Sequence, residues 1–157
     1  MTEYAKLSRI ALDLDTPLGR GTDGSVWKSY RASAVKALER ESNYRIELEC
    51  YQRFADYDVT SIQGFSVPKL IGWNDELSII EIGIVTPPFI IDFAKAWLDR
   101  PPEFSDEQWD DWNHEGEERF ETRWPTVLGL LAALKQYGIY YYDAKPSNIM
   151  FGDEGTL

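Results

Sequence analysis

Three side chains suited to phosphate chemistry lie within six positions of one another near the C-terminal end of the sequence. Asp143, Lys145 and Asn148 occupy a polar stretch that an apolar run leads into and a second apolar run leads out of. A carboxylate can accept a hydroxyl proton, an ammonium can neutralise phosphate charge, and an amide oxygen can hold a divalent cation. We therefore expect a loop between two short buried strands that presents these groups together. The alternative is a simple turn nucleated by Lys-Pro-Ser-Asn, since these residue types form turns in many proteins.

A glycine-spaced segment near the N-terminus could approach phosphate oxygens closely. Gly19, Gly21 and Gly24 precede a run at 25–30 that has the composition of a strand. Glycines at this spacing let a hairpin fold down until its backbone amides reach an anion, because no Cβ is in the way. One alternative is a plain hairpin. Another is a dinucleotide-binding turn, but that turn requires a helix after the glycines and a strand is expected here.

A lysine and a glutamate are placed so that they could form a buried ion pair. Lys36 lies in an apolar run over 32–38 that we expect to be a strand. A buried ammonium needs a partner because an unpaired buried charge is costly, although a lysine on the wet face of an edge strand is the common alternative. The next element is expected to be a helix from about Ser42, as its N-cap, to about Ala55. It carries Glu47 on an aromatic stripe that would face inward, whereas Glu49 lies between two arginines and would face solvent.

The remaining elements are predicted from periodicity and from turn residues. They are a helix from Thr2 to about Asp13, a strand pair over 66–73 and 77–85, a short helix over 89–98, and a helix from Pro125 to Gly138 with a clear apolar stripe. Proline suits the first turn of that last helix and glycine suits its end.

Composition limits the classes of partner and the compartment. The chain has 157 residues, a net charge of −11 and a single cysteine, Cys50. Repulsion from phosphate backbones and anionic lipid argues against nucleic acid or a membrane surface as a partner. One cysteine allows no intrachain disulfide, the N-terminus has no secretory pattern, and the apolar run over 77–91 is too broken to span a bilayer. We therefore expect a cytoplasmic protein.

An acidic segment over 103–121 carries interleaved aromatic residues, Phe104, Trp109, Trp112 and Phe120. One interpretation is a solvated helix or loop whose aromatic side chains dock on the body of the protein. The other is a docking surface for a basic protein partner.

Four of these features resemble, in order and spacing, the N-lobe and catalytic loop of the protein-kinase-like superfamily. They are the glycine hairpin, the strand with Lys36, the helix with the inward Glu47, and the loop Asp-x-Lys-Pro-x-Asn-Ile. The resemblance implies an α+β fold with an antiparallel five-stranded N-lobe and one helix over residues 1–88. A truncated, mainly helical C-lobe over residues 89–157 would follow and end just after the catalytic-type loop. An ATP-type cleft is expected between these lobes.

The resemblance also assigns roles to individual residues. Lys36 would contact the α- and β-phosphates of ATP, and Glu47 would hold Lys36 in place. Asp143 would be the catalytic base, Lys145 would steady the γ-phosphate, and Asn148 would hold Mg²⁺. The full set expected at the nucleotide is the three hairpin glycines, the two residues that would flank adenine, and the ion pair: Gly19, Gly21, Gly24, Val26, Ala34, Lys36 and Glu47.

The sequence departs from the family pattern in two places. Tyr141 and Tyr142 stand where most kinases have His-Arg before the catalytic aspartate, so control through a phosphorylated activation loop is not expected. No Asp-Phe-Gly segment follows the loop, so the family's main magnesium ligand and its substrate-binding helices are missing from this sequence. Asp153 or Glu154 could substitute for that ligand, although carboxylates at a hairpin tip usually serve only to form the turn.

Two functional hypotheses follow. The first is a minimal kinase-like protein that binds ATP and Mg²⁺ and transfers the γ-phosphate to an unknown acceptor. The second is a catalytically inactive kinase-like module that binds a protein partner through its acidic aromatic surface. A fragment of a longer kinase is a third interpretation. The helix from Pro125 would also need cover for its apolar face, which either a homodimer or the acidic segment folding back could supply.

Overall fold

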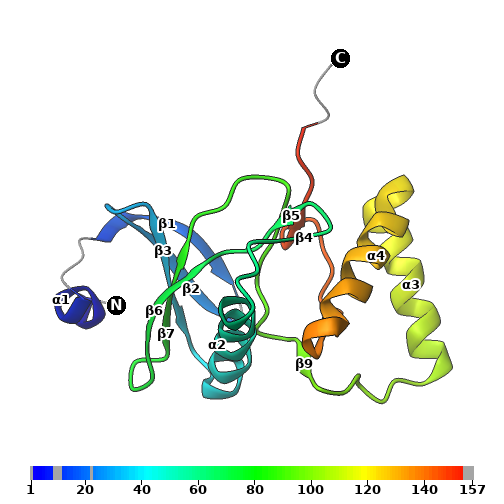
Figure 1. Ribbon diagram of the computed structural model, residues 1–157, viewed down its shortest axis with the longest axis horizontal. Helices are drawn as coiled ribbons and strands as arrows, with labels where there is room; N and C mark the ends of the chain where they lie inside the picture. Colours follow the sequence, from blue (N-terminus) through cyan, green and yellow to red (C-terminus); the bar gives the residue numbers. More distant parts are fainter. Residues whose placement is uncertain (1, 9–11, 22, 154–157) are drawn as a thin grey trace. The chain divides into compact units, whose positions relative to one another are not determined.

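The structure is a computed structural model that describes residues 2–8, 12–21 and 23–153. It divides into two compact units (Figure 1). The first unit contains Met1–Asp58 and Pro68–Val85, and the second contains Val59–Val67 and Thr86–Leu157. The chain therefore leaves the first unit for a short segment, returns to it, and then completes the second.

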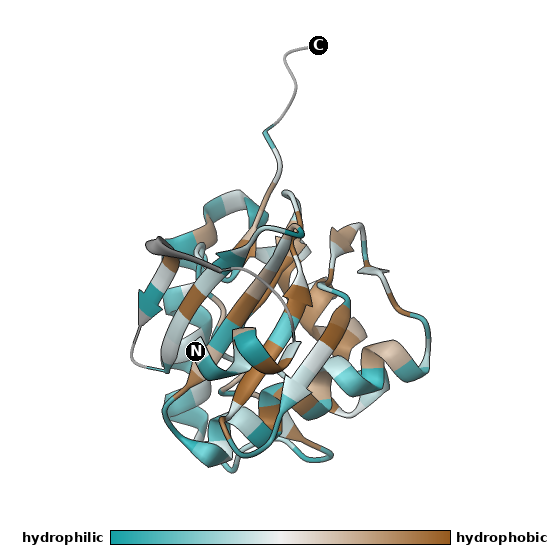
Figure 2. Cartoon of the chain, turned by 90° about the vertical axis from the view of Figure 1, so that its left-hand side faces the viewer, coloured by the Kyte–Doolittle hydropathy of each residue, from teal (hydrophilic) through white to brown (hydrophobic). Residues whose placement is uncertain are grey.

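A five-stranded antiparallel sheet and a helix form the body of the first unit, which confirms the expected α+β arrangement of this region. The strand order is β1-β2-β3-β7-β6, with consecutive neighbours antiparallel. The strands are β1 (Leu12–Gly21), β2 (Gly24–Ser29), β3 (Ser33–Leu38), β6 (Leu70–Asn74) and β7 (Ile79–Gly83). Strands β3 and β7 are buried at nearly every position, as expected for inner strands of a sheet, which Figure 2 shows coloured by hydropathy.

Helix α2 (Glu41–Asp56) packs beside strands β3, β6 and β7 of this sheet (Figure 1). Its bounds lie within one residue of those predicted from the sequence. Arg40 is the N-cap and makes no side-chain capping bond, so the expected cap at Ser42 is wrong. The helix buries one stripe of residues at offsets of three and four, as an amphipathic helix on a sheet must. That stripe consists of Tyr44, Glu47, Leu48, Tyr51 and Phe54, with Cys50 beside it.

Helix α1 (Thr2–Ser8) covers part of the other face of the sheet. Tyr4 packs in a buried cluster with Val35 of β3 and Ile79 of β7. The helix ends earlier than the predicted boundary near Asp13, because the backbone from Leu12 onward pairs with β2. Strand pairing with a partner further along the chain therefore overrides the local helical pattern there.

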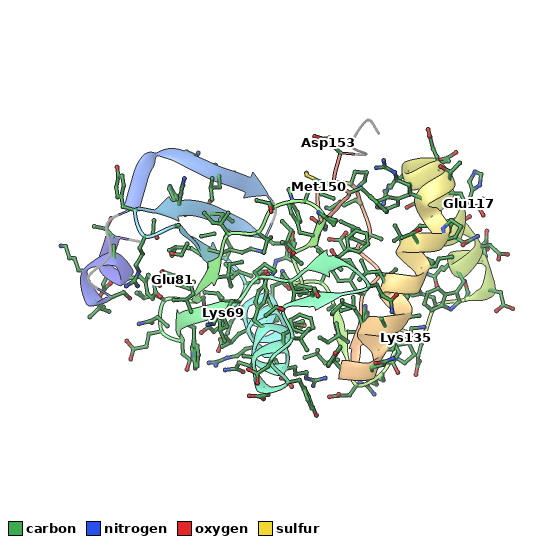
Figure 3. The ribbon with its side chains drawn as sticks, turned by 45° about the horizontal axis from the view of Figure 1, so that its top comes forward. Lys69, Glu81, Glu117, Lys135, Met150 and Asp153 are labelled. Atoms are coloured by element: carbon green, nitrogen blue, oxygen red, sulfur yellow. The ribbon has the colours of Figure 1, made fainter. Side chains whose placement is uncertain are left out.

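Glu81 of β7 is a buried carboxylate that ties α1 to the sheet (Figure 3). Its oxygens accept hydrogen bonds from Tyr4 Oη at 2.9 Å, Ser33 Oγ at 2.6 Å and Arg31 Nη2 at 3.2 Å. Burial alone would raise the pKa of Glu81, but the hydrogen bonds from Ser33, Arg31 and Tyr4 outweigh it and hold the pKa below its ordinary value. Glu81 is therefore charged in the folded protein at neutral pH.

The second unit combines two small sheets with a pair of helices. Strands β11, β8, β5 and β4 form one sheet in that order, and β9 pairs with β10. The strands are β4 (Ser61–Ile62), β5 (Phe65–Ser66), β8 (Phe89–Ile90), β9 (Trp97–Leu98), β10 (Ile139–Tyr140) and β11 (Ile149–Met150). The helix predicted over 89–98 is wrong. That segment instead supplies β8 and β9. The periodicity of so short an apolar run does not separate strand from helix, and the strands that pair with it lie far along the chain.

Helices α3 (Asp106–Phe120) and α4 (Trp124–Leu134) lie side by side (Figure 1). Ser105 and Gln108 form a capping box at the start of α3, which satisfies two of its otherwise unpaired backbone groups. A short 3₁₀ turn, η1 (Glu121–Arg123), joins the helices, and a second, η2 (Lys135–Tyr137), follows α4. Gly138 then takes the left-handed conformation, with φ of 68°, as expected for the residue that ends this helix.

Gly116 allows the two helices to approach closely. A Cβ built on this residue would lie 2.3 Å from the indole ring of Trp124, which is buried. Trp124 also stacks on Phe120 and packs edge-on against Trp112. The acidic segment therefore folds back and covers part of α4. This is one of the two ways, the other being a homodimer, in which the sequence indicated that the apolar face of this helix could be covered.

In the described part of the chain, none of the helices combines the length and the apolarity needed to cross a membrane.

We expect Glu81→Gln to lower the free energy of unfolding by about 1–3 kcal/mol, because the new amide NH₂ would face hydrogen-bond donors. The wild type should also lose this stabilisation in acid. Because the pKa of Glu81 is lower in the folded than in the unfolded chain, the contribution is present above the unfolded value and disappears as the pH falls through the folded value. Urea unfolding between about pH 7 and pH 3 measures both effects. The control is Glu76→Gln at an exposed turn, and equal losses in both variants would contradict the assignment.

We expect Gly116→Ala to destabilise the protein by about 1–3 kcal/mol, because the added methyl group would overlap the ring of Trp124. Gly129→Ala in α4 is the matched control, since nothing lies within 4 Å of its Cβ position. That control should be neutral or stabilising by up to about 1 kcal/mol, as alanine is the better helix former. Thermal and urea unfolding of both variants test the difference, and stabilisation by Gly116→Ala would refute the close helix contact.

Candidate functional site

In the glycine hairpin of the first unit, the fold requires glycine at one position, whereas another position has room for a side chain. Gly24 has φ of 147°, and a Cβ there would lie 2.0 Å from the carbonyl oxygen of Ala37, so β2 can pair with β3 only if this residue is glycine. No atom outside its own neighbours lies within 4 Å of a Cβ placed on Gly19. Gly21 pairs with Gly24 at the end of the β1 and β2 ladder. The strand that follows the glycines is as predicted.

Asp23, at the tip of this hairpin, is turned toward α2. Its Oδ1 accepts a hydrogen bond of 2.9 Å from Asn43 Nδ2, and the residue is buried. The bond fixes the hairpin tip to the start of the helix.

Lys36 and Glu47 form the expected ion pair. Lys36 Nζ lies 2.7 Å from Glu47 Oε2, and both side chains are largely withdrawn from solvent, with 11% and 1% of their surfaces exposed. Glu49 instead points outward and pairs with Arg53 at 2.7 Å, so the choice between the two glutamates made from the helical stripe is confirmed.

The residues predicted to surround a nucleotide base share a face with this lysine. Val26 of β2 lies directly opposite Lys36 in the antiparallel ladder, and Ala34 precedes Lys36 by two positions on β3. Residues opposite each other and two apart on a strand lie on one face of the sheet. The structure therefore brings Val26, Ala34 and Lys36 together, with Glu47 reaching them from α2.

In the second unit, the three polar side chains of the loop converge. Asn148 Nδ2 donates to the backbone oxygen of Asp143 at 3.1 Å and to its Oδ2 at 3.2 Å. Lys145 Nζ lies 3.8 Å from Asp143 Oδ1. The backbone amide groups of Asn148 and Ile149 both donate to the carbonyl of Lys145, which closes the turn. Both carboxylate oxygens of Asp143 therefore face donors.

Short buried strands flank the loop as predicted, but they do not pair with each other. β10 pairs with β9, and β11 pairs with β8. Ile139 and Ile149 are almost fully buried at the two ends of the loop. Each end is therefore anchored by a strand from the segment over 89–98, which the sequence had indicated as a helix.

Three further residues, Tyr141, Ile91 and Phe93, fix the loop and were not identified from the sequence as part of the site. Tyr141 Oη donates to the carbonyl oxygen of Ile91 at 3.1 Å, and its ring packs edge-on against Phe93 with centroids 5.5 Å apart. The backbone amide of Ile91 in turn donates to the carbonyl oxygen of Asn148. These contacts join positions about fifty residues apart in sequence, so no local pattern could have revealed them.

The described residues contain no group of three His, Cys, Asp or Glu side chains that could hold a metal ion by themselves. Asp143 and Asn148 offer one carboxylate and one amide oxygen. This set fits Mg²⁺ that takes one or two protein oxygens and completes its shell with phosphate oxygens and water. Asp153 is exposed (Figure 3), and Glu154, the other candidate substitute ligand, lies outside the described residues.

A pocket of about 600 Å³ lies beside the C-terminal side of this loop. Its lining comes from the end of α3, from η1, and from the residues that follow the loop: Arg119, Phe120, Glu121, Thr122, Arg123, Pro146, Ile149, Met150 and Phe151. Asp143, Lys145 and Asn148 are not among them, so the pocket is separate from the three converging side chains.

Comparison of the sequence with models of known protein families and with characterised proteins finds no match.

We expect Lys36→Met to lower the free energy of unfolding by about 3–5 kcal/mol, because it leaves the Glu47 carboxylate buried without its ammonium partner. The double variant Lys36→Met with Glu47→Leu should recover most of that loss, since a well-packed apolar pair can replace a buried ion pair. Lys28→Met at an exposed position of β2 is the control and should change stability by less than about 0.5 kcal/mol. Urea unfolding measures all three, and similar values for the two single variants would contradict a buried pair.

Proposed function

We propose that this chain is a kinase-like protein that binds ATP with Mg²⁺ and transfers the γ-phosphate to an acceptor. The observation that carries the proposal is the buried ion pair of Lys36 and Glu47 on the sheet face that also holds Val26 and Ala34. The five-stranded antiparallel sheet with one helix agrees with a kinase-like first half.

The ion pair favours a function because stability alone gives no reason for it. Replacing a buried ion pair by apolar residues is often neutral or stabilising, so its presence in a sheet face of apolar residues suggests a task for the ammonium. Glu47 holds Lys36 Nζ at a fixed position, where it can meet an anion without a cost in side-chain ordering. The α- and β-phosphates of ATP are the anions that the resemblance implies for this lysine.

The loop of the second unit supplies the groups that phosphoryl transfer needs. Asp143 would accept the proton of an acceptor hydroxyl, and Lys145 would neutralise charge on the transferred phosphate. Asn148 would offer its amide oxygen to Mg²⁺, since its amide nitrogen is committed to Asp143. Bound Mg²⁺ supplies further charge neutralisation at the phosphates. With so few protein ligands, we expect the ion to bind together with the nucleotide and not before it.

The alternative is a kinase-like module that binds a protein partner without catalysis. Packing within the second unit weakens the version of this proposal that uses the aromatic residues of α3. Trp109 and Trp112 are half-buried and pack edge-on against Tyr142, with centroids 4.9 Å and 5.3 Å apart, so part of each ring is used within the unit. A basic partner would then be recognised mainly through the carboxylates.

We expect ATP and Mg²⁺ together to raise the melting temperature by several degrees, since a ligand at a hundred times its Kd stabilises the native state by about 2.7 kcal/mol. Mg²⁺ alone should leave it unchanged. Lys36→Ala should abolish the shift, whereas Lys28→Ala, the exposed control on β2, should retain it. A flat response of the wild type at millimolar ATP would refute nucleotide binding.

Two substitutions in the loop separate binding of ATP and Mg²⁺ from transfer of the γ-phosphate, when melting and phosphate transfer are both measured. Asn148→Ala should lose the part of the shift that depends on Mg²⁺. Asp143→Asn keeps one side-chain oxygen beside Asn148, so it should retain most of the shift, but it should lose transfer of labelled γ-phosphate to water or an added acceptor. A wild type that binds ATP and transfers no phosphate to any acceptor would favour the non-catalytic alternative.

A further inference from the structure

We propose that helix α3 positions the loop around Asp143, and that Trp112 and Arg119 are the positioning residues. The arrangement of the loop is a property of the second unit alone. Its consequence for phosphate transfer rests on the proposed function.

Two side chains of α3 hold the backbone on either side of Asp143. Trp112 Nε1 donates to the carbonyl oxygen of Tyr142 at 2.9 Å. Arg119 Nη1 donates to the carbonyl oxygen of Ala144 at 3.3 Å. The two donors are seven positions apart, so they lie two turns apart on the same face of the helix. The carbonyl groups of the residues before and after Asp143 are therefore both tied to one helix.

The side chain of Tyr142 is held by the same helix. Its ring packs against Trp109 and Trp112 of α3 and against Phe104, which precedes the helix, with centroids between 4.9 Å and 6.3 Å apart. Burial in this cluster raises the pKa of the Tyr142 hydroxyl above its ordinary value. The residue before Asp143 is thus fixed through both its carbonyl and its ring.

Helix α3 is itself well anchored, which a positioning element requires. Its start is capped by Ser105 and Gln108, and Gly116 brings it against Trp124 of α4. Trp124 Nε1 donates to Asn113 Oδ1 at 2.9 Å, which links the two helices by a further hydrogen bond. Helix α4 therefore contacts α3, and α3 in turn contacts the loop.

This arrangement leaves Asp143 little freedom. Its flanking carbonyls are held by α3, and Asn148 Nδ2 donates to its backbone oxygen and to its carboxylate. A carboxylate that acts as a base must be placed to within a fraction of an ångström, and small displacements cost large factors in rate. Trp112 and Arg119 touch neither substrate nor cofactor in this proposal, so they act through Asp143.

Conservative variants test the two hydrogen bonds. Trp112→Phe keeps an aromatic ring in the cluster but removes the donor, and Trp109→Phe is its control because Trp109 packs on Tyr142 but does not hold either carbonyl. Arg119→Met keeps most of the aliphatic stem and removes the donor. Its control is Glu115→Gln, which removes the ion pair that Arg119 makes at 3.4 Å and leaves the bond to Ala144 in place.

Backbone amide hydrogen exchange of the protein without nucleotide is the primary measurement. We expect the loop amides of Asn148 and Ile149 to exchange about tenfold faster in Trp112→Phe and Arg119→Met than in their controls. Amides of β3 in the first unit and the melting temperature should be the same in each variant and its control. Equal loop exchange in variant and control would overturn the proposal, and so would a loss of protection throughout the second unit, which would indicate a general structural role.

Phosphate transfer gives the second measurement. In both variants kcat should fall by at least about tenfold while KM for ATP and the melting shift with ATP and Mg²⁺ stay unchanged, because only the base is displaced. A matching rise in KM would overturn the positioning role. If the wild type shows no melting shift with ATP, the proposed function fails, and hydrogen exchange still decides whether α3 positions the loop.

Discussion

Each half of the buried ion pair of Lys36 and Glu47 requires the other, and this constraint governs the face of the first unit's sheet that meets α2. An ammonium placed in a sheet face with apolar neighbours is tolerated only if a carboxylate meets it, because an unpaired charge there would be too costly. Glu47 lies on the buried stripe of α2 that also carries Tyr44 and Tyr51, so the ion pair and the apolar contacts turn the same side of the helix toward the sheet. Val26 and Ala34 then lie on the same face as Lys36 as a consequence of the strand ladder.

The constraint in the second unit is different, because a polar turn must be held between two apolar strands. The two short strands at the ends of the loop do not pair with each other, so each needs a partner from elsewhere, and the segment over 89–98 supplies both. The two tyrosines before Asp143 pack against different parts of the unit. Tyr141 points to Phe93 and the carbonyl of Ile91, whereas Tyr142 packs among the aromatic residues of α3. The acidic helix is thus part of the structural support of the loop as well as a solvated surface.

Much of both units could be predicted from local patterns. The stripe on α2 distinguished Glu47 from Glu49, because offsets of three, four and seven give a helix an inward and an outward face. Gly138 indicated the end of the helix from Pro125 because its left-handed φ favours glycine. Three assignments failed. The residues over 89–98 form strands, the opening helix is shorter than expected, and Ser42 does not cap α2. In the first two cases strand pairing outweighed the local preference: β8 and β9 pair with strands far along the chain, and β1 pairs with the next strand, β2.

Residue types and their spacing specify the chemistry of the candidate site: an ammonium in an apolar strand, a carboxylate on an inward stripe, glycines at a hairpin, and Asp143, Lys145 and Asn148 within one turn. These follow from residue type and periodicity, which act over a few positions. What holds these groups in place follows from the packing within each unit. The bonds from Trp112 and Arg119 to the loop carbonyls have this origin, and so do the hydrogen bonds to Glu81 that tie α1 to the sheet. They join residues far apart in the chain, and their existence depends on packing that no short stretch of sequence encodes.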